Sequence, residues 1–262
     1  MNLCCLVTPF FFDEHDPRLR EAVPSHLSHA TNEANSVVNR TPECLSRTHG
    51  PIADFVSATV KRGEIPMSIA GDCAASLPVV AGLQSAGIRP VLVWLDAHGD
   101  FNTPETSPSG FLGGMPLAMM VGRGDLSLAQ TSGQTPVSEQ DVWLVDARDL
   151  DPLEEVALGS SQINRISIEA LSELVLDRPV YLHIDNDIID AEEVPANNYP
   201  VPNGPSLNAV IENCIAFASQ NSICAISLSG WNGHLDSDGE TGRACQKLLS
   251  SIASVLNGKK HP

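Results

Sequence analysis

The sequence predicts an α/β fold with a mainly parallel central sheet, formed as a single domain over residues 1–262. Apolar runs rich in β-favouring residues alternate with helical patterns along the chain, which is the order of repeating βαβ units. Two of these runs, at 91–95 and 180–184, contain or lead into acidic and histidine side chains. Open α/β sheets bind ligands beyond the carboxyl ends of their strands, so both runs are typical of central strands that carry a site.

The N-terminal run 3–12 is predicted to be the first core strand, and 13–50 a surface connection with short helical pieces, because prolines interrupt it. A helix is expected over 52–61. One βαβ unit follows, made of strand 67–70, helix 74–86 and strand 91–95. The later elements are predicted as helix 116–121, strand 141–145, helix 167–175, strand 180–187, helix 207–219, strand 223–228 and helix 242–256.

Composition limits the class of partner. The chain has 15 Lys and Arg against 32 Asp and Glu, a formal net charge of −17, which repels nucleic acid and anionic membranes. A small cationic or neutral molecule is the expected partner, and the oligomeric state, including a homo-oligomer, is left open. Seven irregularly spaced cysteines without a CxxC pair indicate a reducing compartment, the cytoplasm. The run 3–12 lacks a positively charged flank and is too short to span a bilayer, so neither a signal peptide nor an anchor is expected.

Three potential metal ligands stand at the end of the strand at 91–95: Asp96, His98 and Asp100. In an extended chain this spacing puts all three side chains on the same side. Two carboxylates and one imidazole suit a divalent cation, and the oxygen-rich set favours Mn²⁺. A strand followed by a polar glycine turn explains the stretch equally well, so on its own it leaves both interpretations open.

The second informative strand carries His183, Asp185 and Asp187 at a period of two, so the three side chains are expected on one face. Neighbouring carboxylates repel one another unless a cation lies between them. An exposed edge strand with a polar face is the alternative. The apolar residues that adjoin these positions favour a central strand and therefore a site.

These two segments resemble a known family. Asp-Ala-His-Gly-Asp-Phe-Asn-Thr at 96–103, with Ser-Gly at 109–110 and Gly-Met-Pro-Leu at 114–117, resembles the signature loop of the arginase, agmatinase and formiminoglutamase family, the ureohydrolases. His-Ile-Asp-Asn-Asp-Ile-Ile-Asp at 183–190 is similar to the second signature of that family, usually Ser-x-Asp-x-Asp-x-x-Asp-Pro. The resemblance covers about 71–232 and implies the arginase-like fold, a three-layer α/β/α sandwich.

The resemblance also implies a binuclear manganese site held by Cys73, Asp96, His98, Asp100, Asp185 and Asp187. In that pattern Asp96 and Asp185 bridge the two ions, Asp100 and Cys73 complete one ion, and the remaining two residues complete the other. Cys73 departs from the family, whose Gly-Asp-His-Ser is Gly-Asp-Cys-Ala at 71–74. A thiolate ligand shifts the preference at that ion toward Zn²⁺ or Fe²⁺. The alternative is that Cys73 is a small buried residue that binds nothing.

The activity that the resemblance implies is metal-dependent hydrolysis of a C–N bond in a guanidino, amidino or formimino group. Three further departures concern the orientation of the substrate. Asn-Tyr-Pro at 198–200 stands where the family usually has Gly-Thr-Pro after the second signature, and two glycines replace family side chains. Gly113 stands where the family has a histidine that handles protons, and Gly230 where it has a glutamate that grips a guanidinium. Hydrolysis of free arginine is therefore not expected. Asn102 and Ser109 resemble residues that hold the amino-acid end of the substrate in arginases, and they are predicted to bind a polar group.

Asp100 and His183 are the candidate catalytic residues. His183 replaces a family serine, and either takes over proton transfer or hydrogen-bonds a ligand carboxylate as a support. His234, after the last strand, is a further candidate for proton transfer, with simple solvent exposure as its alternative. Two functions remain open: a hydrolase of a small molecule other than arginine, and a catalytically inactive arginase-like protein with a binding or regulatory role.

Overall fold

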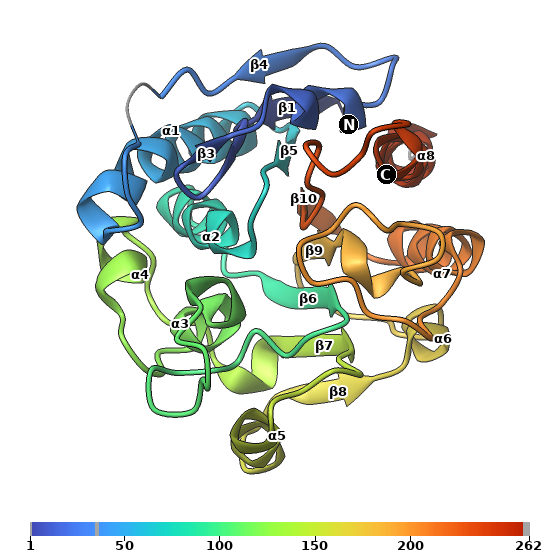
Figure 1. Cartoon of the computed structure of the whole chain (residues 1–262). Coiled ribbons are helices and arrows are strands. Elements are labelled where there is room, and N and C mark those ends of the chain that lie inside the picture. The colour runs from blue at the N-terminus through green and yellow to red at the C-terminus, as the bar shows by residue number, and fades with distance from the viewer. Residues whose placement is uncertain (1, 35–36, 259–262) are drawn as a thin grey trace.

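The computed structural model describes residues 2–34 and 37–258 (Figure 1). Within this part of the chain an eight-stranded parallel sheet has the order β4-β1-β5-β10-β9-β6-β7-β8. Its strands are β1 (Leu3–Val7), β4 (His29–Thr31), β5 (Ile65–Ile69), β6 (Val91–Asp96), β7 (Val142–Asp146), β8 (Asn164–Ile166), β9 (Val180–Asp185) and β10 (Ile223–Ser229). A short antiparallel pair consists of β2 (Phe10–Phe11) and β3 (Glu14–His15).

Helices cover both faces of this sheet (Figure 1). One face carries α1 (Pro42–Lys61), α2 (Ser76–Ser85), α3 (Pro116–Met120) and α4 (Ser127–Thr131). The other face carries α6 (Ile168–Leu171), α7 (Leu207–Gln220) and α8 (Glu240–Gly258), while α5 (Pro152–Gly159) lies near β8. The predicted three-layer α/β/α architecture is confirmed. Among the described helices, none is both long and apolar enough to cross a membrane.

Side chains that alternate along the central strands fill two cores. In β6, Val93 and Leu95 pack with residues of α7 and α8, whereas Leu92 and Trp94 pack with residues of α1 and α2. All four are fully buried. Burying each such side chain contributes about 1.5–3 kcal/mol, which explains why the strand is apolar on both faces up to its polar end.

Most of the predicted central elements are confirmed to within a few residues, but the N-terminal predictions are partly wrong. The strand predicted over 3–12 ends at Val7, since Pro9 has no N–H with which to continue a ladder. The helix predicted from 52 begins at Pro42, and Pro51 lies inside it. Proline is favoured in the first turn of a helix, where Thr41 caps the N–H of Cys44.

The segment 13–50 is more than a surface connection. It contributes the edge strand β4 to the sheet, and Leu19 and Leu45 are buried in the two cores. The strands β3 and β4 in this segment were not predicted, and neither were α4, α5 and β8. The last three are short, and they lie at the periphery of the molecule in Figure 1. The prediction of a single domain over 1–262 stays a prediction.

Candidate metal centre

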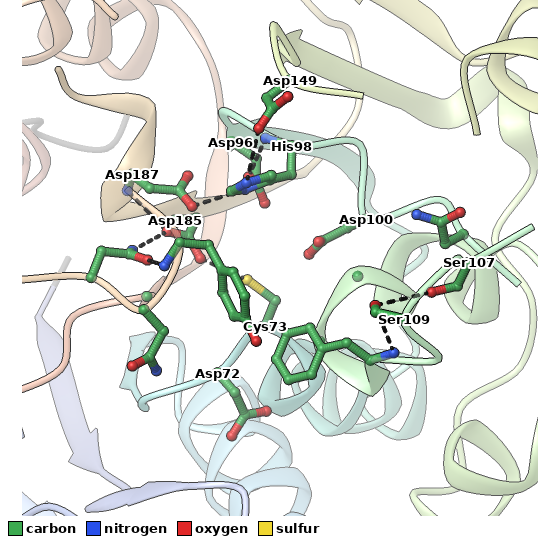
Figure 2. Close-up of a pocket in the computed structure, with 18 of the residues that line it drawn as sticks. Asp72, Cys73, Asp96, His98, Asp100, Ser107, Ser109, Asp149, Asp185 and Asp187 are labelled. Atoms are coloured by element: carbon green, nitrogen blue, oxygen red, sulfur yellow. Dashed lines mark hydrogen bonds and ion pairs between the residues drawn. The ribbon is translucent and has the colours of Figure 1, made fainter. Parts of the chain in front are cut away.

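A cavity of about 230 Å³ opens where β5, β6, β9 and β10 end (Figure 2). It is lined by all six ligands that the family resemblance implies: Cys73, Asp96, His98, Asp100, Asp185 and Asp187. Asp96 and Asp185 are the last residues of β6 and β9, and Cys73 opens the 3-10 turn η2 (Cys73–Ala75) after β5. In the sheet, β6 and β9 are neighbours, and only β10 separates β9 from β5. Their carboxyl ends therefore bring distant parts of the sequence together.

The loop after β6 leaves the extended conformation and turns toward the cavity. The expectation that Asp96, His98 and Asp100 share one side of an extended strand is wrong, because β6 ends at Asp96 and Asp100 has a φ of 48°. The main-chain carbonyl of Asp100 accepts hydrogen bonds from the N–H groups of Leu117 and Ala118. These bonds hold the loop in the turn through which the three side chains meet.

The end of β9 differs from its predicted geometry in a similar way. The strand stops at Asp185, and Asp187 lies in the 3-10 turn η5 (Asn186–Ile188), so the period of two does not extend to it. Asp185 Oδ1 accepts the N–H of Asp187 at 2.9 Å, and Asp187 Oδ1 accepts the N–H of Ala97 at 3.1 Å. Main-chain donors from both loops thus orient the carboxylates.

His98 lies between two carboxylates at the open side of the cavity. Its Nδ1 is 3.0 Å from Asp187 Oδ2 and 3.4 Å from Asp96 Oδ1. Burial disfavours the imidazolium, but the hydrogen bonds and charges of Asp187 and Asp96 outweigh it and raise the pKa of His98 to about 12. This cluster therefore attracts a positive charge strongly, either a proton or a cation.

Cys73 and Asp185 lie at the buried side. Cys73 Sγ donates to Asp185 Oδ2 at 2.9 Å and lies 3.1 Å from Ser229 Oγ. Burial, and then the charge of Asp185, raises the pKa of the Cys73 thiol well above its usual range. Burial, and then the charge of Asp187, raises the pKa of Asp185 to about 7. The negative charges here are not balanced by any cationic side chain of the cavity other than His98, among the described residues.

Asp100 presents an oxygen without a partner among the described residues, which a proton or a cation would compensate. Its side chain is only 5% exposed, and within the described part of the chain its Oδ2 has no hydrogen-bond partner. Burial, followed by the charges of Asp96 and Asp185, raises its pKa well above the usual range. A buried carboxylate oxygen without a partner costs free energy unless a proton or cation compensates it. The oxygen, nitrogen and sulfur atoms of the cavity are suitable donors for divalent metal ions.

His183 lies behind the cavity rather than in its lining. It is fully buried, its ring is 3.8 Å from that of Trp94 between ring centroids, and burial lowers its pKa to about 3. A buried, neutral imidazole outside the lining does not support proton exchange with a substrate. His234 is also outside the lining; its Nε2 lies 3.1 Å from the main-chain oxygen of His15.

Asp96 belongs to two groups of possible ligands. Its carboxylate lies with His98 and Asp187 in one group, and with Cys73 and His183 in the other. Within each group the ligand atoms are all within 4.8 Å of one another. The geometry thus offers two neighbouring positions that share one carboxylate.

Asn102 and Ser109 line the cavity, as the predicted substrate-binding role requires. The amide of Asn102 donates to Asp151 Oδ2 at 2.9 Å, and its Oδ1 accepts from Thr106 Oγ1 at 2.9 Å. Ser109 Oγ accepts the N–H of Phe111 at 3.2 Å. Asn102 is therefore already oriented by protein groups, whereas Ser109 Oγ has only one further contact among the described residues, with Ser107 Oγ at 3.5 Å.

Sequence reasoning missed several lining residues, among them Asp151 and Glu154. Glu154 is almost fully buried, and its carboxylate accepts the N–H groups of Phe101 and Asp151. The two acids form the capping box of α5, with Pro152 in its first turn. The pattern Asp-Pro-x-Glu at 151–154 is a helix-start signal, so the sequence did contain the information needed to find this helix.

The two glycines that depart from the family pattern have no room for a larger side chain. A Cβ on Gly113 would lie 2.3 Å from Cε1 of Phe111, whose ring covers that position. A Cβ on Gly230 would lie 2.0 Å from Asp185 Oδ1, and its φ of +88° is a conformation that other residues rarely adopt. Neither site can accept the family side chain without displacing a neighbour.

Aromatic rings surround the mouth of the cavity. Phe111 lies 4.9 Å from Tyr199 and 6.5 Å from Phe11 between ring centroids, and all three residues line the cavity. Among the described residues, no lysine or arginine lines it. The mouth is thus apolar, and the interior is acidic.

Comparison with known proteins identifies the family. The family model described as "Arginase family" matches residues 18–254. The chain is 30% identical over 216 residues to an arginase of Brevibacillus brevis, covering 77% of this chain and 72% of that protein. It is 27% identical over 254 residues to an arginase of Schizosaccharomyces pombe, covering 90% of this chain and 78% of that protein.

Solved structures show the same fold. The structure of arginase from Bacillus cereus has a TM-score of 0.85 at 23% identity and covers 100% of both chains. That of formimidoylglutamase from Bacillus subtilis has a TM-score of 0.74 at 15% identity, covering 100% of this chain and 89% of that one. The predicted arginase-like fold and the resemblance are confirmed, and this chain belongs to the arginase family.

Proposed function

We propose that this arginase-family hydrolase cleaves a C–N bond in a small guanidino, amidino or related compound other than free arginine, using two divalent cations. The observation that carries the proposal is the position of Asp96, which is shared by two groups of ligand atoms at the base of one cavity. Bridging by Asp96 and Asp185, as the family pattern implies, agrees with their central places at the ends of β6 and β9. Mn²⁺ is the expected ion, with Zn²⁺ or Fe²⁺ as alternatives beside Cys73.

Two divalent cations, when bound, supply Lewis acidity and lower the pKa of a water molecule. The residues of the chain compensate the charge of the cations, orient the ligands and restrict the access of water. The buried carboxylates compensate the positive charge, and the main-chain donors of Ala97 and Asp187 hold two of them in place. Phe111 and Tyr199 narrow the mouth, which limits the access of bulk water to the reacting group.

The lining favours a substrate that carries a cationic or neutral C–N group and an apolar substituent, without a carboxylate. Among the described residues, no lysine or arginine lines the cavity to pair with the α-carboxylate of an amino acid, so Asn102 and Ser109 would have to bind it without a cationic side chain. Asp149, Asp151 and Glu154 add further negative charge to one wall. Gly230 has no side chain with which to bind a guanidinium as a family glutamate would, and a Cβ there would lie 2.0 Å from Asp185 Oδ1. The relatives named arginases make free arginine the compound against which this proposal must be tested.

A second candidate is a catalytically inactive protein that binds a small molecule or regulates a partner. The exchanges at Cys73, Gly113 and Gly230 favour it, since all three affect groups that the family uses in catalysis. Under either function we propose a cytoplasmic location, which the free thiols of the described cysteines support.

The deciding experiment measures turnover of the full chain with Mn²⁺ or Zn²⁺ against arginine, alkyl and aryl guanidines, amidines and ureido compounds. Release of urea, ammonia or amine is the readout. We expect turnover of at least one carboxylate-free compound, with slower or no turnover of arginine, and loss of activity in Asp96→Asn. Metal binding without turnover of any compound would support the inactive alternative. Arginine as the fastest substrate would contradict the proposed specificity.

A further inference from the structure

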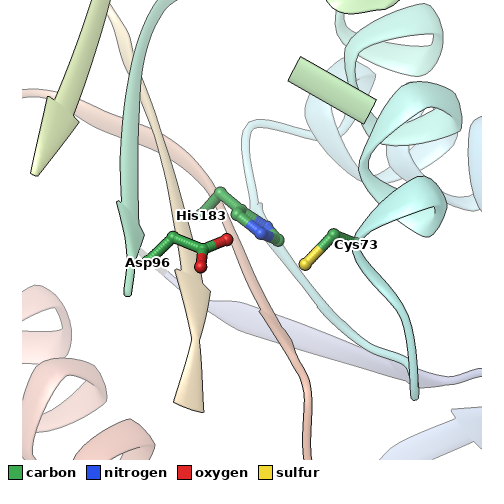
Figure 3. Close-up of side chains that lie close together, drawn as sticks. All are labelled: Cys73, Asp96 and His183. Atoms are coloured by element: carbon green, nitrogen blue, oxygen red, sulfur yellow. The ribbon is translucent and has the colours of Figure 1, made fainter. Parts of the chain in front are cut away.

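Two departures from the family pattern meet in space. Cys73 stands where the family has a histidine, and His183 stands where it has a serine. The ligand atoms of these two residues and of Asp96 lie within 4.8 Å of one another, and all three side chains are buried. Figure 3 shows the imidazole between the carboxylate and the sulfur. An imidazole is therefore still present at this end of the centre, but it comes from β9 instead of from η2.

The orientation of His183 leaves one ring nitrogen facing the cluster. Its Nδ1 lies 2.8 Å from Ser76 Oγ and 2.8 Å from Ser227 Oγ. Ser227 also contacts the hydroxyl of Tyr181 at 2.6 Å, so a buried network holds that side of the ring. The other nitrogen, Nε2, faces Ser229 Oγ at 3.4 Å. A histidine that binds a metal usually has its second nitrogen fixed by a hydrogen bond in this way.

Independent evidence for a ligand comes from the same cavity. Asp100 is buried, and Figure 2 shows its carboxylate directed into the space near Cys73 and Asp185. In the described part of the chain its Oδ2 has no hydrogen-bond partner. A cation beside Cys73 would compensate this oxygen, which no group of the described residues does.

We propose that His183 is a metal ligand and supplies, through Nε2, the imidazole that the family pattern has at position 73. Cys73 and Asp96 are further ligands of the same ion, next to the carboxylate of Asp100, and the thiol loses its proton when the ion binds. This inference rests on the metal centre of the proposed function and changes the residues that hold one of its ions. A sulfur, nitrogen and oxygen set favours Zn²⁺ over Mn²⁺, whereas the position beside His98 and Asp187 keeps a nitrogen and oxygen set that suits Mn²⁺. The two positions thus differ in their preferred metal.

The test uses Co²⁺ and Zn²⁺ as probes of the full-length protein, with no assay of activity. Wild type loaded with Co²⁺ is expected to show a sulfur-to-cobalt charge-transfer band, which Cys73→Ser abolishes. His183→Gln should keep that band, change the visible d–d bands, and weaken Zn²⁺ binding by about tenfold or more. The double variant Cys73→His with His183→Ser restores the family pattern and is expected to prefer Mn²⁺ over Zn²⁺.

His49→Gln is the matched control. His49 is also a buried histidine whose Nδ1 contacts a serine hydroxyl, that of Ser132 at 2.7 Å, and it is not part of the cavity lining. If His183→Gln alters the cobalt spectrum and the Zn²⁺ affinity no more than His49→Gln does, the proposal is overturned.

A measurement on the wild-type protein tests the proposal without relying on the folding of any variant. In protein labelled with ¹⁵N-histidine, saturating Zn²⁺ is expected to move the ring-nitrogen signals of two of the eight histidines, His98 and His183, to metal-bound values. Movement of His98 alone would exclude His183 as a ligand while the metal centre itself stands. Binding of no metal at all would overturn the centre and, with it, this inference.

Discussion

Replacing Asp185 by asparagine is expected to stabilise the metal-free protein near neutral pH and to destabilise the metal-loaded protein, both relative to wild type. Asp185 is buried at the centre of the cavity, and burial together with Asp187 raises its pKa to about 7. Asparagine has nearly the same shape and can still accept the N–H of Asp187. The substitution therefore removes a buried charge with little change in packing.

The direction of the stability change follows from the pKa of Asp185 in the unfolded chain and its pKa in the folded chain. In the unfolded chain Asp185 ionises near its usual value of 3.8, whereas in the metal-free folded protein it keeps its proton up to about 7. Its contribution to folding is complete below about pH 4 and is lost as the pH rises through 7. At about pH 8 the lost stability amounts to about 4 kcal/mol for an isolated group. Because Asp187 and Asp96 share protons with it, we expect roughly 2–4 kcal/mol, or about 5–15 °C in Tm for a chain of this size.

The assay is thermal unfolding of both proteins in chelator at about pH 5 and about pH 8, and again with saturating Mn²⁺ or Zn²⁺. Chelated Asp185→Asn should melt above wild type at the higher pH, with a smaller difference at the lower one. Metal at about 100 times its Kd should add roughly 3 kcal/mol to wild type and much less to the variant. Asp236→Asn is the control, since this buried carboxylate accepts the N–H of Gly242 and lies outside the cavity, and its loss should destabilise under every condition.

Either of two results would refute this reasoning. If chelated Asp185→Asn is no more stable than wild type at about pH 8, the buried charge carries no penalty. If metal stabilises the variant as much as wild type, Asp185 does not bind the ion.

Three other outcomes are expected. Chelator should lower the Tm of wild type, and an unchanged Tm with no metal found by elemental analysis would contradict the metal centre. Asp96→Asn and Asp185→Asn should each empty both cation positions after dialysis, whereas Cys73→Ala empties at most one; equal loss in all three would show that the bridging assignment is wrong. Gly230→Ala should lose about 2 kcal/mol or more in urea unfolding, because its Cβ would lie 2.0 Å from Asp185 Oδ1. Gly133→Ala, with a φ of +76° and open space around it, should lose less, and equal losses would argue against crowding at Gly230.

The centre of the fold could be predicted because its strands are apolar on both faces. The runs at 91–95 and 223–228 correspond to β6 and β10 nearly residue for residue, since burial on both faces leaves a continuous apolar signal. Proline was a less reliable guide. Pro42 begins α1 and Pro51 lies within it, because the packing of a long helix against α2 and β5 outweighs the loss of one main-chain hydrogen bond.

The sequence predicted that the six proposed ligands lie close together, but it did not predict the turns that place them. Residues at the carboxyl ends of neighbouring parallel strands must lie close together, and the six predicted lining residues do. The conformation of Asp100, with a φ of 48°, depends on hydrogen bonds from α3, which periodicity cannot represent. The turn that places Asp187 is likewise set by contacts between two loops.

Considered one position at a time, the exchanges at Cys73, Gly113 and Gly230 each remove a side chain that the family pattern has. In three dimensions each has a partner. His183 brings an imidazole beside Cys73, the ring of Phe111 covers Gly113, and the carboxylate of Asp185 lies against Gly230. A Cβ added at Gly113 would lie 2.3 Å from the Phe111 ring, and one at Gly230 would lie 2.0 Å from Asp185 Oδ1, so either neighbour would have to shift. The effect of each exchange on the cavity therefore has to be judged together with this neighbour and not from the single substitution.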